Sequence, residues 1–522
     1  MYLQKLQSRC RALSRALVIG TAVIALAGCA SGVEEAEGGQ SNGEARSGGT
    51  LQVAQGADAE PATFLNPSLG NLLTQFTVFE TLTKVSTETG EPEPVVAESW
   101  ELAPDGKSMT LELRDDVTFH SGRTLTSADV EFALTQMKDP ALSPGGQVMA
   151  NNITGIETPS DTEVVLTFSQ PMPNIFDLFE LMPLVDKETF DDIASGEEVI
   201  GTGRFTWESW TPGSKISLAK YEDHRDTDGT ALDAIDINII TDPTAELAAM
   251  KSGRVDYASG LAPLDVRSLT GSDGFNVVKS GGSALPLAFD VRKAPFDNKD
   301  VRQAVHYAID RDRINEQVQG GLGSPTSLPW QEATVGYDPT QGERYMLDVD
   351  KARELLASAG VEDGTAFEVL VPDFPESVQM FEIIKNNLAE VGLEAKAKVV
   401  TSADYGERVS KGDMGTPAFL MRNGNGPTPA TQVQSRPELQ AKGNMHHFTS
   451  PEYSDLVAAL SSAVGPEAAA QALSDYNEYF LDEAFCLPLN VRPSISVRTD
   501  RVDGIKSTQQ GYIDLSTAHL TS

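Results

Sequence analysis

The chain has 522 residues, with 40 Lys and Arg against 76 Asp and Glu, so its formal net charge is −36. This acidity argues against a nucleic-acid partner, because such binding depends on Lys and Arg that displace counterions from phosphates. The length predicts about two or three globular domains. Cys10, Cys29 and Cys486 form no CxxC pair, which excludes a disulfide framework and a zinc knuckle.

Residues 1–28 have the pattern of a lipoprotein signal peptide. Basic residues precede an apolar run at 16–26, which is shorter than the roughly 20 residues of a membrane-spanning helix. The run ends in Leu26-Ala27-Gly28-Cys29, which looks like a bacterial lipobox. We therefore expect cleavage before Cys29 and lipidation of its thiol. An ordinary secretory signal is the alternative.

Residues 29–49 are predicted to form a lipidated, flexible tether. The stretch 30–49 holds a single large apolar side chain, so burial cannot offset the entropy of ordering it. No later segment approaches 18 continuous apolar residues. We expect the lipid to be the membrane anchor, on the extracytoplasmic face of the cell membrane, in the periplasm or at the cell surface.

From Thr50 onward, strand-like alternation and amphipathic helical patterns interleave, which predicts an α/β fold. A hairpin is expected at 100–114, where Asp105-Gly106 supplies the turn, followed by a strand at 161–168. Later segments have helix-start and helix-stop residues. Asn298 is expected to cap one helix, and Asp348 to cap a second one that ends at Gly360. A third helix is expected to end at Val391 before Gly392, and a fourth to begin at Ser450-Pro451.

The sequence offers no specific catalytic or metal motif. No serine lies in a GxSxG turn, and the histidines form no HExxH pair. Cys486 lies in an apolar run and is expected in the core, whereas His446 or His447 is left open as a ligand or metal contact. We predict that the protein is not an enzyme and has no cofactor and no resident metal.

A series of motifs in the mature sequence resembles the extracellular solute-binding proteins of ABC importers, family 5, which include oligopeptide, dipeptide and nickel binders. Each motif alone is weak, but their order is specific. They lie at 48–51, 65–67, 79–82, 94–100, 105–107, 113–122, 128–130, 201–205, 253–256, 301–311 and 352–360.

The resemblance implies a two-lobed periplasmic-binding-protein-like fold, class II type, with an extra subdomain in the first lobe. The chain would cross between the lobes near 284–290 and 486–491, and the ligand would be enclosed when the lobes close. The expected parts are lobe one at 50–284 with the subdomain at about 84–200, lobe two at 285–490, and a return to lobe one at 491–522.

The function implied by the resemblance is capture of a peptide or peptide-like solute and its delivery to a membrane permease. Its partners would be the ABC permease and ATPase subunits, and we expect a monomer. A nickel chelate or another non-peptide solute is an alternative ligand. A lipid-anchored surface receptor, acting in signalling or adhesion without transport, is the alternative from another functional class.

Ligand contacts are expected from loops near strand ends. The predicted residues are Phe64, Leu69, Asn71, Trp330, Met421, Arg422, Asn423 and Asn425. Peptide-binding relatives typically carry a Trp and, three residues later, an Asp that pairs with the peptide's ammonium group. Alignment on Pro429 places Arg422 and Asn425 at these two positions, and Thr428 at a second acid. The carboxylate is therefore missing here, and this departure from the family pattern predicts a ligand whose end is blocked, neutral or anionic at this point.

Overall fold

The computed structural model describes residues 45–87, 89–143, 145–422, 428–508 and 510–522, all within one compact unit. The predicted signal peptide and Cys29 lie outside the described residues, as do Asn423 and Asn425.

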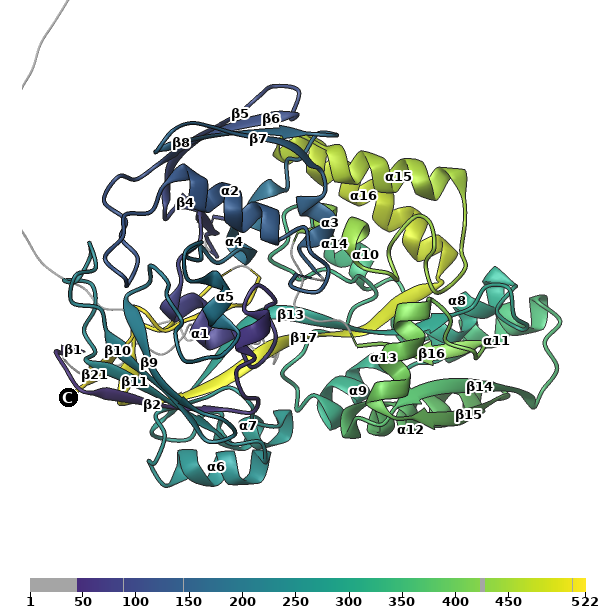
Figure 1. Cartoon of the computed structure of the whole chain (residues 1–522). Helices are drawn as coiled ribbons and strands as arrows, with labels where there is room; N and C mark the ends of the chain where they lie inside the picture. Colours follow the sequence, from purple (N-terminus) through teal and green to yellow (C-terminus); the bar gives the residue numbers. More distant parts are fainter. Residues whose placement is uncertain (1–44, 88, 144, 423–427, 509) are drawn as a thin grey trace, which may run out of the picture. The chain divides into compact units, whose positions relative to one another are not determined.

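A ten-stranded mixed sheet organises this unit (Figure 1). The β14–β15 and β2–β11 pairs are parallel, whereas β13 and β17 are antiparallel. The predicted α/β class is therefore confirmed. In spatial order the strands are β15 (Leu393–Val400), β14 (Thr365–Pro372), β16 (Ala418–Leu420), β13 (Phe275–Phe289), β17 (Cys486–Thr499), β12 (Tyr257–Ala258), β2 (Thr50–Gln55), β11 (Ala234–Ile239), β10 (Lys215–Lys220) and β9 (Phe205–Thr211).

The long strands β13 and β17 join two groups of strands. Their pairing extends from Phe275 opposite Thr499 to Ala288 opposite Cys486. At the first end β17 also pairs with β12, and at the second end β13 also pairs with β16. The crossings predicted at 284–290 and 486–491 coincide with the second end of this pair.

Separate apolar cores lie on the two sides of this strand pair. One core contains residues from 51–257 and 502–520, including Leu51 and Leu515. Two others contain residues from 285–489, including Val369 and Tyr476. Burial of each set stabilises its own side, because apolar surface removed from water contributes roughly 25 cal/mol per Å². A fourth core, which includes Val266 and Leu322, contains residues from both sides. The other three cores are separate, which allows most of each lobe to move as a unit.

A second, four-stranded antiparallel sheet lies within the region predicted as a subdomain. Its order is β5 (Ala97–Leu102), β6 (Ser108–Leu113), β8 (Glu163–Phe168) and β7 (Ile153–Ser160), so the predicted hairpin and following strand are confirmed. Gly106 has φ +67° in the hairpin turn, where glycine is favoured. The accompanying helices are α2 (Ser127–Gln136), α3 (Gln147–Ala150), α4 (Ile175–Leu181) and α5 (Phe190–Ile193).

Three small sheets account for the other strands of the described residues. They are β3 (Thr83–Val85) with β4 (Pro92–Pro94), β19 (Lys506–Ser507) with β20 (Ile513–Asp514), and β1 (Ala45–Arg46) with β21 (His519–Thr521) and β18 (Val502–Asp503). The remaining helices before β13 are α1 (Leu72–Val78), α6 (Pro243–Lys251) and α7 (Pro263–Leu269). A short 3-10 helix spans Pro61–Thr63.

The helices between β13 and β17 begin where their capping residues predict. The side chains of Asn298, Asp348 and Ser450 accept backbone hydrogen bonds at the starts of α8, α11 and α15. The helices are α8 (Lys299–Ala308), α9 (Arg311–Val318), α10 (Pro339–Gly342), α11 (Val349–Ser358), α12 (Pro375–Glu390), α13 (Ser402–Lys411), α14 (Pro429–Ser435), α15 (Pro451–Ser462) and α16 (Pro466–Glu483). Within the described ranges, no helix has both the length and the apolar character needed to span a bilayer.

Candidate functional site

Arg492 marks the candidate site on β17, beside the crossing between the two strand groups. It lies opposite Ser283 of β13 in the ladder, and its Nη1 atom is 3.1 Å from Oε2 of Glu376 at the start of α12. Gln319 also donates a hydrogen bond to Glu376. The Arg492 and Glu376 side chains are only 19% and 17% exposed, so the ion pair is largely shielded from water.

Arg422 lies close enough to Arg492 for its positive charge to affect the pKa of Arg492. Its guanidinium carbon is 5.1 Å from the centre of the Phe374 ring, a cation–π geometry, and the residue is exposed. The preceding Met421 is buried, and its backbone nitrogen donates a 2.9 Å hydrogen bond to the carbonyl of Pro286 on β13. This hydrogen bond to β13 therefore fixes the position of the backbone immediately before Arg422.

The charges of this site favour an anionic partner. Burial lowers the pKa of Arg492, Glu376 opposes that shift, and the positive charge of Arg422 lowers the pKa further. Glu376 pairs with Arg492, and Arg422 adds a second guanidinium charge that acts on Arg492. A carboxylate or phosphate on a solute would relieve the repulsion between Arg422 and Arg492 and could accept paired hydrogen bonds.

The predicted residues of the first lobe lie together in one loop, but their side chains differ in exposure. Phe64 is buried and packs edge-on against Trp207, with 5.7 Å between ring centres. Asn71 is also buried; its Oδ1 accepts from the Glu60 backbone nitrogen, and its Nδ2 donates to the Thr63 carbonyl. Leu69 is 76% exposed. These contacts of Phe64 and Asn71 stabilise the loop itself.

Trp330 is separated from this loop and lies in an apolar core of the second lobe. It is 1% exposed, and its Nε1 donates a 2.7 Å hydrogen bond to Oδ1 of Asn477 on α16. Its ring packs on Tyr476. The structure therefore brings Met421 and Arg422 to the crossing strands and gives Phe64, Asn71 and Trp330 packing partners elsewhere.

Of the other reactive side chains considered above, Cys486 and His446 lie in the interior, whereas His447 is half-buried. Burial raises the pKa of the Cys486 thiol well above its usual value, which disfavours the nucleophilic thiolate. Burial likewise lowers the pKa of His446 to about 3, and its ring stacks on Phe419. Among the described residues, no group of three or more His, Cys, Asp or Glu is placed to hold a metal ion.

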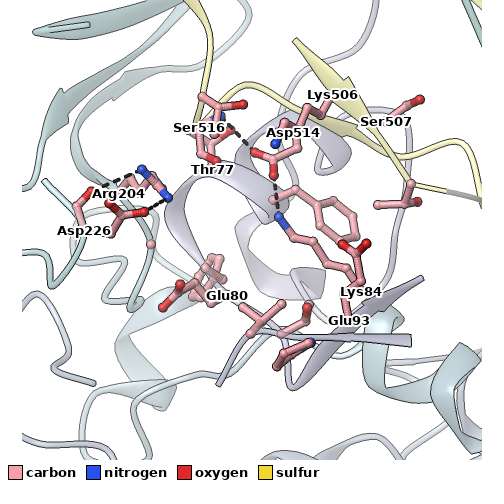
Figure 2. A pocket seen from close by; sticks show the side chains of 18 of the residues that line it. Thr77, Glu80, Lys84, Glu93, Arg204, Asp226, Lys506, Ser507, Asp514 and Ser516 are labelled. Atoms are coloured by element: carbon pink, nitrogen blue, oxygen red, sulfur yellow. Dashed lines mark hydrogen bonds and ion pairs between the residues drawn. The ribbon is translucent and has the colours of Figure 1, made fainter. Parts of the chain in front are cut away.

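A separate polar pocket of about 960 Å³ lies between α1, the β3–β4 hairpin and the β19–β20 hairpin (Figure 2). Six of its charged side chains are paired with one another: Lys84 with Asp514, Arg204 with Asp226, and Arg225 with Glu80. Glu93 and Lys506 also line the pocket. Burial alone would raise the pKa of Glu80, but His224, whose Nε2 atom is 3.6 Å from Oε1 of Glu80, and the hydrogen-bonded Arg225 lower it to about 2. A ligand here would have to displace these ion pairs, so the crossing strands remain the better candidate site.

Sequence reasoning missed Arg492, Glu376 and Phe374. A charged residue inside the largely uncharged run at 486–497 was the available signal for Arg492. Its neighbours could not be inferred in the same way, because Glu376 lies 116 residues from Arg492 in the sequence. Their juxtaposition depends on how α12 packs beside β17.

Comparison with known proteins agrees with this architecture. Residues 91–436 match the profile described as "Bacterial extracellular solute-binding proteins, family 5 Middle". Heme-binding protein A of Haemophilus influenzae is 24% identical over 468 residues, covering 83% of this chain and 85% of its own. Di/tripeptide-binding protein 1 of Pseudomonas aeruginosa is 29% identical over 371 residues, covering 65% and 68%.

A solved structure extends the similarity to three dimensions. AgaA of A. tumefaciens R10, in complex with agropinic acid, superposes with a TM-score of 0.76 at 23% identity, covering 91% of this chain and 99% of its own. The fold is accordingly the two-lobed one that was expected. Because the family profile covers more than half of the sequence, the chain belongs to the bacterial extracellular solute-binding proteins, family 5.

Proposed function

We propose that this protein is the substrate-binding lipoprotein of an ABC importer. It captures a peptide or peptide-like solute between its lobes and presents the closed form to a membrane permease, which works with ATPase subunits. The observation that carries this proposal is the β13–β17 pair, which joins two separately packed halves at a site lined by Arg422 and Arg492. Such an arrangement suits binding by closure, because a ligand that contacts both lobes favours the closed state.

The ligand is proposed to have a blocked, neutral or anionic end near Arg422. Free peptides carry an ammonium group, which is costly to enclose without a counter-charge. Arg422 and Arg492 raise that cost, whereas they stabilise a carboxylate. The named relatives bind di- and tripeptides, heme or agropinic acid, so the family similarity is compatible with peptide and non-peptide solutes.

Native mass spectrometry of the purified protein, followed by mild denaturation, tests the function by identifying a released solute. Calorimetry then compares di- to pentapeptides with their N-acetylated forms. We expect the acetylated forms to bind more tightly, Arg422→Ala to weaken that binding about tenfold or more, and Asn425→Asp to improve binding of free amines. Arg353→Ala, at an exposed arginine on α11, is the matched control.

Submicromolar binding of free peptides that acetylation abolishes would refute the proposed ligand chemistry. It would show that another acidic residue holds the ammonium group. Binding of a nickel chelate in the same assay would favour the non-peptide alternative. A protein that binds no solute and acts beside a sensor kinase would favour the surface-receptor alternative.

Lipidation of Cys29 is part of the proposal, because it would hold the protein at the extracytoplasmic face. Only the thiol of this position can accept the diacylglycerol, so Cys29→Ser should abolish incorporation of labelled palmitate. Cys486→Ser, at a buried thiol, is the control and should retain the label. Equal labelling of wild type and Cys29→Ser would contradict the lipoprotein assignment.

A further inference from the structure

A buried hydrogen-bond cluster links α4 to the start of α14, although 251 residues separate Asp177 from Thr428. Oδ2 of Asp177 accepts a 3.2 Å hydrogen bond from the Thr428 backbone nitrogen and further bonds from the hydroxyls of Thr428 and Thr431. Asn174 donates to the Thr431 hydroxyl oxygen at 2.6 Å. Asp177 and Thr431 are 3% and 1% exposed, whereas Thr428 is half-buried, so the Asp177 carboxylate is largely shielded from water.

The two sides of this cluster belong to different parts of the two-lobed fold. Helix α4 precedes β13, whereas α14 lies between β13 and β17. The contact therefore joins the lobes through side chains, apart from the two strands that connect them covalently. Separation of the lobes would break three hydrogen bonds to Asp177 at once. A buried donor without an acceptor costs free energy until water takes the place of the acceptor.

We propose that Asp177 is a positioning residue that holds the two lobes in their closed arrangement. This inference rests on the proposed function, because closure is what would retain a solute. Asp177 touches the opposite lobe rather than the solute, and it acts by stabilising one of the two arrangements. A residue of this kind raises the apparent affinity for any solute that binds only the closed form.

The charge state of Asp177 gives the contact a pH dependence. Burial raises the pKa of Asp177 to about 6, although hydrogen bonds from Thr428 and Thr431 lower it in part. Two titratable groups interact electrostatically with Asp177: Glu180 on the same helix and Tyr512 on the C-terminal segment. Lys84 in turn lowers the pKa of Glu180, and Arg436 lowers that of Tyr512.

All three hydrogen bonds end on Oδ2, so a proton on Oδ1 leaves the acceptor in place. Opening lets water reach the carboxylate and stabilises its ionised form. The contribution of Asp177 to the closed arrangement is therefore fully present below its ordinary pKa of 3.8 and is lost as the pH rises through about 6.

Glu180 provides a matched comparison on the same helix. It is fully buried, and its carboxylate accepts hydrogen bonds from the Val85 backbone nitrogen at 3.0 Å and from Gln510 at 2.7 Å. Both partners lie outside the 285–490 segment. Glu180→Ala thus removes a buried carboxylate without removing the link to α14.

The test measures the distance between spin labels at Glu157 on β7 and Asn386 on α12, both exposed, without any solute. Attachment through p-acetylphenylalanine avoids the native thiols. We expect Asp177→Ala to raise the ratio of open to closed molecules on the order of tenfold at pH 5. Asp177→Asn keeps a side-chain oxygen that can accept the hydrogen bonds. It should therefore show the wild-type distances at pH 5, but these distances should not lengthen between pH 5 and pH 8.

Unchanged distances in Asp177→Ala would overturn the proposal, as would equal lengthening in Glu180→Ala. If Asp177→Ala does not fold, Thr431→Val removes one donor from the opposite side and should lengthen the distance in the same direction. Because no solute is added, failure here is separate from failure of solute binding, which mass spectrometry and calorimetry report independently.

Discussion

A substitution of Trp330 can show whether this residue has a packing role or a ligand-binding role. Trp330→Phe keeps most of the apolar volume but removes the Nε1 donor, which leaves the buried Oδ1 of Asn477 without that bond. We expect the free energy of unfolding to fall by about 1–3 kcal/mol in urea titrations. If the role is packing, calorimetry should find solute affinity unchanged.

Trp100→Phe is the control for this change. Its ring is only partly buried and packs on Phe176, so truncation should cost less stability. A tenfold loss of solute affinity in Trp330→Phe, with unfolding unaffected, would instead place Trp330 in the binding site.

Glu180 should make stability decrease with rising pH. Burial raises its pKa to about 7, above the ordinary value of 4.5. A raised carboxyl pKa contributes stability that is present below about pH 4.5 and is lost as the pH rises through about 7. Between pH 5 and pH 8, the unfolding free energy of the wild type should therefore fall relative to that of Glu180→Gln.

Glu80 should change the free energy of unfolding with pH in the opposite direction, and it serves as the comparison. Its pKa is lowered to about 2, so its contribution is present above about pH 4.5 and is lost as the pH falls towards 2. Urea unfolding at a series of pH values measures both effects. Parallel curves for wild type and Glu180→Gln from pH 5 to pH 8 would contradict the assignment of a raised pKa.

At the scale of elements, Ser450 connects the start of α15 to α16. Its Oγ accepts a 3.3 Å hydrogen bond from the Tyr453 backbone nitrogen and a 2.8 Å bond from the Tyr479 hydroxyl. Ser450→Ala should lower the free energy of unfolding by about 1 kcal/mol, since it removes the helix cap. Ser462→Ala, at the exposed end of the same helix, should change it far less.

Such elements could be predicted because their signals are local. Asp105-Gly106 indicated a turn between two alternating segments, and Asn298 indicated a helix start, without reference to distant residues. The surroundings of Asn71 were not predictable in this way, because its amide binds backbone groups whose approach depends on the folded loop. The contact between Asp177 and Thr428 requires two lobes to meet, which no local pattern specifies.

At the scale of the whole molecule, the contacts that resist opening of the lobes differ in strength. The Arg267–Glu316 ion pair links α7 to α9 at 3.0 Å, but both side chains are more than half exposed. Exposed pairs typically contribute about 0–1 kcal/mol, so this pair is a weak restraint. The buried Asp177 cluster is the stronger one. The balance between open and closed forms can thus be shifted by the binding free energy of a solute.

Solution scattering tests whether the whole molecule responds to its solute. The separately packed halves are joined by β13 and β17, so each can move as a rigid body when these strands bend or twist. Adding back the solute identified by mass spectrometry to solute-free protein should reduce the radius of gyration. Asp177→Ala, with its weaker closed form, should need a higher solute concentration for the same reduction. An unchanged radius at saturating solute would instead indicate a rigid surface receptor.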